Sequence, residues 1–261
     1  MFTQKNRYDM YDLLVIMEKL RSPDGCPWDR EQTHESIRRN LIEETYEAAE
    51  AIDTHDMQLL REELGDMLLQ IVFHAQIEKE QGSFDFGDVC DGICKKLVLR
   101  HPHVFSDVVA KDAEQALKSW DAVKRSEKDR KSESDMLTGV SKALPALMRS
   151  EKVQSRAAKA GFDYEHAHEA LLDLQSEISE LEQAIASGNK DFIHEELGDL
   201  LFAAVNVSRF TLVDAEKSLY DSCDKFISRF SRVEQLARER GIDMKAAGMN
   251  LLNSLWSEAK L

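Results

Sequence analysis

The sequence predicts an all-α protein built from two tandem copies of one helical unit. Only 4 Pro and 11 Gly are spread over 261 residues, so long segments contain no helix breaker. Apolar residues in these segments recur at the spacing of a helix that buries one face. One such segment, Glu196-Leu-Gly-Asp199, nearly repeats an earlier one, Glu63-Leu-Gly-Asp66. Near-identity over so long a separation indicates an internal duplication.

Composition limits the partners and the location of the protein. Hydrophobic residues make up 43% of the chain, enough for one large helical core or two small ones. A net charge of -15 argues against a nucleic-acid or anionic-membrane surface, because both would be repelled. The chain has no signal-peptide pattern, no apolar run near the ~18 residues of a membrane helix, and no Cys-x-x-Cys pair. These features predict a soluble, reduced, cytoplasmic protein.

The first half is predicted to form five helices separated by turn residues. Asp29 is the expected N-cap of the second helix, and the turn after that helix is expected near His55. Gly82 ends the third helix and Pro102 interrupts the pattern after the fourth. The expected spans are 10–21, 31–52, 59–81, 89–100 and a helix from about residue 113 that carries Trp120.

A polar tract separates the two copies. Residues 128–140 contain few apolar side chains and are predicted to be a linker between units at 1–127 and 141–261. Four acids of the first unit recur 133 residues later: Glu44, Glu47, Glu63 and Asp66 as Glu177, Glu180, Glu196 and Asp199. Three further matches occur in the same order: Trp28-Asp29 with Phe162-Asp163, Lys96 and Arg100 with Lys225 and Arg229, and Trp120 with Trp256.

The four acids of each unit are symmetric about a turn. Glu47 and Glu63 each lie eight residues from His55, and Glu44 and Asp66 each lie eleven from it. In the second unit Gly188 occupies the midpoint. Two antiparallel helices would therefore bring the four carboxylates to one volume roughly 12 Å from the turn.

Such a cluster predicts a cation site. Like charges about 4 Å apart repel by roughly 4 kcal/mol at an effective dielectric of 20, and a divalent cation removes this cost. Oxygen ligands without His or Cys suit Mg²⁺ or Mn²⁺ better than zinc. Asp66, seven residues from both Leu59 and Phe73, is expected to be buried among apolar side chains, as is Asp199 in the second unit.

Other readings of these residues remain open at this level. The acids could form solvated helix faces or a duplicated salt-bridge scheme, and the protein could be a non-enzymatic scaffold that binds metal or a partner. Glu31-x-x-His34 and Glu165-x-x-His168 resemble half of a di-iron site. Lys225 and Arg229, four residues apart, could orient phosphates or form a surface pair. Trp256 could stack on a base or pack in a core.

Several motifs together resemble the two-repeat MazG-type nucleoside triphosphate pyrophosphohydrolases. They are spread over nearly the whole chain: GCPWD at 25–29, EETYE at 43–47, EELGD at 62–66, HPHVF at 101–105, LPALMR at 144–149 and AGFDY at 160–164. The resemblance implies helical units that form four-helix bundles completed by dimerisation. It also implies Mg²⁺-dependent cleavage of NTPs or dNTPs to a nucleoside monophosphate and pyrophosphate.

The same resemblance implies roles for individual residues. The second repeat is the expected main site, with metal-binding and catalytic acids Glu177, Glu180, Glu196 and Asp199. The first repeat offers a second set of metal-binding acids at Glu44, Glu47, Glu63 and Asp66, and by residue type this set is the more complete. Lys225 and Arg229 are expected near the triphosphate, and Trp256 near the base.

Overall fold

The computed structural model describes residues 4–106, 112, 115–116, 119–120, 123 and 133–260. All regular elements of this part are helices, which confirms the predicted all-α class. The chain divides into two compact units, Met1–Lys128 and Asp129–Leu261. No helix of the described residues is both long and apolar enough to cross a membrane.

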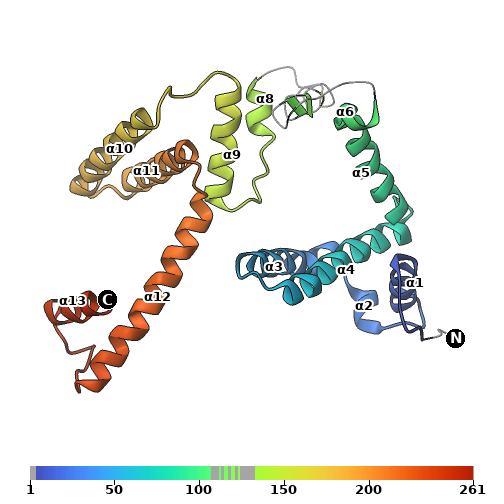
Figure 1. Ribbon diagram of the computed structural model, residues 1–261, viewed down its shortest axis with the longest axis horizontal. Coiled ribbons are helices and arrows are strands. Elements are labelled where there is room, and N and C mark those ends of the chain that lie inside the picture. The colour runs from blue at the N-terminus through green and yellow to red at the C-terminus, as the bar shows by residue number, and fades with distance from the viewer. Residues whose placement is uncertain are drawn as a thin grey trace. The chain divides into compact units, whose positions relative to one another are not determined.

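A helical hairpin organises the first unit. Helices α3 (His34–Asp53) and α4 (Met57–Gln81) lie antiparallel side by side (Figure 1). The predicted reversal at His55 is confirmed, and this residue takes the left-handed conformation with φ 57°. The other described helices of this unit are α1 (Met10–Arg21), α2 (Pro27–Glu31), α5 (Phe86–Arg100) and α6 (Pro102–Phe105).

The second unit contains the matching hairpin. Helices α10 (Ala167–Ser187) and α11 (Lys190–Thr211) reverse at Gly188, whose φ of 67° favours glycine. Helix α9 packs against α11 as α1 packs against α4. The remaining described helices are α8 (Glu133–Thr138), α9 (Ala146–Lys159), α12 (Ala215–Glu239) and α13 (Met249–Glu258).

Two predicted helix starts were wrong, and side-chain capping explains both. The helix expected over 31–52 is divided into α2 and α3, and Asp29 lies inside α2 instead of capping the longer helix. Thr33 caps α3, because its hydroxyl accepts from the Ser36 amide at 3.3 Å while the Ser36 hydroxyl accepts from the Thr33 amide at 2.9 Å. Asp85 likewise starts α5 at Phe86, three residues before the expected position.

Part of the predicted linker is helical. Residues 133–138 form α8, which packs against α9. Residues 139–140 follow α8 outside any regular element. Residues 128–132 lie outside the described part of the chain, as does the start of the helix expected from about residue 113.

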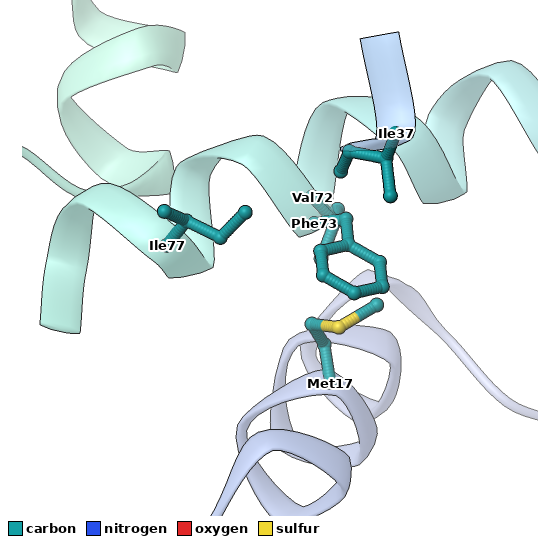
Figure 2. Close-up of a cluster of buried hydrophobic side chains, with 5 residues drawn as sticks. All are labelled: Met17, Ile37, Val72, Phe73 and Ile77. Atoms are coloured by element: carbon teal, nitrogen blue, oxygen red, sulfur yellow. The ribbon is translucent and has the colours of Figure 1, made fainter. Parts of the chain in front are cut away.

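The core of the first unit joins three helices. Figure 2 shows Met17 of α1 and Ile37 of α3 meeting Phe73 of α4, with Val72 and Ile77 beside them. Each of the five side chains is at most 5% exposed. Helix α1 is therefore fixed across the end of the hairpin that lies away from His55.

Candidate metal centre

Each hairpin brings three carboxylates together. In the first unit Glu44 of α3 and Glu63 and Asp66 of α4 each offer an oxygen, and these oxygens lie within 4.8 Å of one another. The second unit repeats the arrangement within the same limit, with Glu177, Glu196 and Asp199. The symmetry of the acids about each turn predicted that four carboxylates would face one another. In both units three of these four carboxylates do so.

The fourth acid of each predicted set lies at the edge of its group. Glu47 and Glu180 are exposed and are not members of the two groups of three. Both are still close enough to act on their neighbours by charge: Glu47 on Glu63, and Glu180 on Glu196. Glu180 also accepts a hydrogen bond from the Ser176 hydroxyl at 3.1 Å.

The prediction that the aspartates are the buried acids was wrong. Glu63 and Glu196 are the buried carboxylates, each 7% exposed, whereas Asp66 is half-buried and Asp199 is exposed. Phe73, on the same stripe as Asp66, is buried because it packs in the cluster that includes Met17 of α1. Asp66 lies on α4 two turns before Phe73. At this level the facing helix α3 contributes Glu44 and not an apolar side chain, so Asp66 is not enclosed in a core.

The groups are electrostatically unfavourable without a cation. Burial, and then the charges of neighbouring acids, raise the pKa of Glu44 and of Glu63. The same causes, in the same order, raise the pKa of Glu177 and of Glu196. A divalent cation among these oxygens would stabilise the ionised carboxylates, and an all-oxygen donor set fits Mg²⁺ or Mn²⁺.

The predicted nucleotide-binding residues are gathered on α12 and α13. Lys225 is exposed and Arg229 is half-buried, and within the described chain neither forms an ion pair or hydrogen bond with the carboxylate group of α10 and α11. Trp256 packs against a cluster that includes Val233 and Leu255, and its ring centroid lies 5.1 Å from that of Phe226. This packing corresponds to the core reading of Trp256.

The described residues do not form the di-iron site that the two Glu-x-x-His motifs resemble. Neither carboxylate group includes His34 or His168. His34 instead lies against His74, with 2.7 Å between their Nδ1 atoms, and its Nε2 lies 2.6 Å from Glu78 Oε1. These contacts tie α3 to α4 and explain His34 structurally.

One feature beside the second carboxylate group was missed at the sequence level. A cavity of about 480 Å³ lies among α9, α10 and α11, and Gln154, Asp173 and Asn206 are its amide and acidic lining residues beside the ion pair of Asp163 and Arg209. The repeat contained a signal of this cavity. At an offset of 133, Gln154 takes the place of Arg21 and Asn206 takes the place of Phe73.

Comparisons with known proteins converge on one family. The model of the MazG nucleotide pyrophosphohydrolase domain matches residues 32–105 and again residues 165–233. A nucleoside triphosphate pyrophosphohydrolase of Escherichia coli K12 is 41% identical over 253 residues, covering 95% of each chain.

Thermotoga maritima supplies two further relatives. Its nucleoside triphosphate pyrophosphohydrolase/pyrophosphatase MazG is 42% identical over 251 residues, which cover 95% of this chain and 94% of that protein. The crystal structure of a mazG-related protein from the same organism aligns with a TM-score of 0.39 and 30% identity, over 44% of this chain and 99% of the other.

Proposed function

This chain belongs to the MazG nucleotide pyrophosphohydrolase family, and we propose that it hydrolyses NTPs or dNTPs between the α and β phosphates. The products would be a nucleoside monophosphate and pyrophosphate. The observation that carries the proposal is the pair of three-carboxylate groups, found in a chain whose relatives are named nucleoside triphosphate pyrophosphohydrolases. The proposed cofactor is Mg²⁺, with Mn²⁺ as a substitute, and the proposed location is the cytoplasm.

The acids of the second unit have defined roles in this proposal. Glu177, Glu196 and Asp199 hold the metal, with Glu180 at the edge of the group as the fourth member. These acids would hold Mg²⁺, which would supply Lewis-acid chemistry to the phosphate and to the attacking water. A glutamate of the set accepts the proton of the attacking water, whose oxygen forms a bond to the α phosphorus as the bond to the pyrophosphate oxygen breaks. No covalent enzyme intermediate is required.

Lys225 and Arg229 are proposed to bind the triphosphate. Two cations one helical turn apart can offset the charge of the departing pyrophosphate. Trp256 remains the prediction of the family resemblance for the base, although its packing against α12 accounts for its position without a ligand.

A homodimer is proposed as the working form, in which these cations would reach the carboxylates of a second subunit. Helix α12 exposes five large hydrophobic side chains, each 46% to 61% exposed: Leu219, Tyr220, Phe226, Ile227 and Phe230. Light scattering coupled to size-exclusion chromatography tests this proposal, and a monomer at micromolar concentration would contradict it.

Product analysis tests the activity. Purified protein is incubated with a panel of NTPs and dNTPs, with and without Mg²⁺, and products are separated by ion-exchange chromatography. A monophosphate with pyrophosphate, formed only with metal, is the expected result. A diphosphate with inorganic phosphate, or no turnover, would contradict the proposal.

A further inference from the structure

Two histidines join the helices of the first hairpin at the end that lies away from His55. The Nδ1 atom of His34, at the start of α3, lies 2.7 Å from the Nδ1 atom of His74 on α4. Their rings are stacked, with centroids 5.0 Å apart and planes 10° from parallel. Only one hydrogen fits between two nitrogens at this distance, so one Nδ1 donates it and the other accepts it.

Glu78 determines which nitrogen of His34 carries a hydrogen. His34 Nε2 lies 2.6 Å from Glu78 Oε1, and this hydrogen bond is the largest of the causes that lower the pKa of Glu78. An ionised carboxylate only accepts, so His34 Nε2 donates. The neutral His34 ring then has its lone pair on Nδ1, and His74 donates to it from its own Nδ1.

The His74 ring has no acceptor for an added hydrogen. Its Nε2 atom is buried and has no hydrogen-bond partner among the described residues. A proton added at this atom would form a buried N–H without an acceptor. A proton added at His34 Nδ1 would displace the hydrogen of His74 from Nδ1 to Nε2, with the same result. Burial first, and then the charge of His34, accordingly lower the pKa of His74.

A second added proton is incompatible with the contact. With both rings charged, each Nδ1 carries a hydrogen, and two N–H groups would face each other across 2.7 Å. Separated rings can take up these protons at about pH 6.5, the ordinary pKa of histidine. The separated state therefore binds more protons than the joined state, and lowering the pH favours separation.

The other charged groups at this end of the hairpin do not offset this effect. A cavity of about 520 Å³ beside His34 is lined by the charged residues Arg21 of α1, Glu35 of α3, and Glu78 and Glu80 of α4. Arg21 forms an ion pair with Glu80 at 2.8 Å, and Glu78 is the partner of His34. The segment before α3 contributes uncharged side chains to the lining, and Asp85 of α5 lies along another face of α4, beside Lys79.

The second hairpin has no counterpart of this contact. At the offset of 133 that relates the two hairpins, the three equivalent residues are Ala167, Val207 and Thr211. Ala167 is the first residue of α10, as His34 is the first residue of α3. None of the three side chains titrates near pH 6.5. The second hairpin therefore serves as an internal control for the first.

We propose that the His34–His74 contact is an acid-sensitive joint, which holds the first turn of α3 on α4 at neutral pH and releases it below about pH 6.5. The cavity that His34 lines opens with this turn. Ile37 belongs to the apolar cluster of Figure 2, so the release is confined to the start of the helix. The joint does not depend on nucleotide hydrolysis.

Hydrogen exchange tests the joint, with rates corrected for the pH dependence of amide exchange itself. The reporters are the amides of Ser36 and Ile37, which both donate to Thr33. Between pH 7.5 and pH 5.5 their opening constant should rise about tenfold in wild type for each proton taken up on release. In His74→Phe, whose new ring takes up no proton, it should change less than twofold.

The matched amides of the second unit, at positions 169 and 170, should change less than twofold in both proteins. An equal rise in wild type and in His74→Phe, an equal rise in both units, or no rise in wild type would overturn the joint.

A second measurement applies if circular dichroism shows that His74→Phe disorders the first unit. The His74 ring of wild type is then titrated by NMR alongside the exchange measurement. Proton uptake that parallels the loss of protection at Ser36 and Ile37 supports the joint. Proton uptake near pH 6.5 with protection unchanged overturns it, because the closed contact would then accommodate the proton.

Discussion

The two hairpins keep the same acids but differ in what lies beside them. In both units three carboxylate oxygens meet within the same limit, and in both the same causes raise the pKa of two glutamates. Along the hairpin beyond these acids the first unit has an apolar core and an Arg21–Glu80 ion pair. The second unit has a cavity there whose lining includes Gln154, and the Oε1 atom of this residue is buried without a hydrogen-bond partner. The carboxylate group is therefore duplicated without its surroundings.

The largest expected difference between the units is catalytic. Asp199→Asn should reduce Mg²⁺-dependent turnover roughly 1000-fold, because a ligand of the metal that stabilises transition-state charge is lost. Glu180→Gln should act in the same direction. Asp66→Asn in the first unit should leave turnover within about threefold. Because Asp199 is exposed, circular dichroism should show an intact fold. Equal losses from Asp66→Asn and Asp199→Asn would mean that the units do not differ in this way.

The second difference concerns stability. Arg21→Met should lower the free energy of unfolding by about 2 kcal/mol, allowing for the partial exposure of Glu80, because two carbonyls, Asp29 O and Gln32 O, also lose their donor. Gln154→Met, at the equivalent position, should cost about 1 kcal/mol. Urea denaturation measures both, and a larger loss for Gln154→Met would show that the cavity is a structural element.

The third difference lies in the basic pairs. Lys225→Ala should raise KM for NTP about tenfold, the effect of losing one charge-assisted hydrogen bond to phosphate. Lys96→Ala, at the matching place of the first unit, should change KM less than twofold. Initial rates over a range of NTP concentrations give both KM values. Similar KM values for the two variants would contradict the expectation that only the basic pair of the second unit binds the triphosphate.

The smallest effect should be shared by both units. Since burial and neighbouring acids raise the pKa of Glu63 and Glu196, protons compete with metal above the ordinary glutamate range, and Mg²⁺ affinity should fall as the pH is lowered from 8 to 5. In metal-free protein these groups contribute stability that is fully present below their unfolded pKa and is lost as pH rises through the folded pKa. Thermal shifts by Mg²⁺ should therefore be larger at pH 8, and an equal shift at both values would contradict this.

Much of the architecture could be predicted because it depends on local spacing. The hairpins follow from helical periodicity and from turns at His55 and Gly188, and the facing of the acids follows from their equal distances to those turns. Periodicity could not identify Glu63 rather than Asp66 as the buried acid, because burial depends on which side chain the facing helix presents at that level. The caps at Thr33 and Asp85 depend on hydroxyl and carboxylate geometry that several neighbouring residues could have supplied.

The cavity could not be predicted for a related reason. A void is the absence of a side chain, and it depends on residues from three helices packing at one level. Only the replacement of Arg21 and Phe73 by Gln154 and Asn206 marks it in the sequence.

The constant offset of 133 between the two hairpins has a consequence for how this chain can tolerate insertions and deletions. One residue added at the His55 or Gly188 turn would move every acid of the following helix by about 1.5 Å along the axis and rotate it by about 100°, so that the carboxylates no longer meet. Outside the hairpins the offset drifts from 129, at Lys96 and Lys225, to 136, at Trp120 and Trp256. The two repeats thus differ in length only outside the segments in which facing carboxylates must stay level.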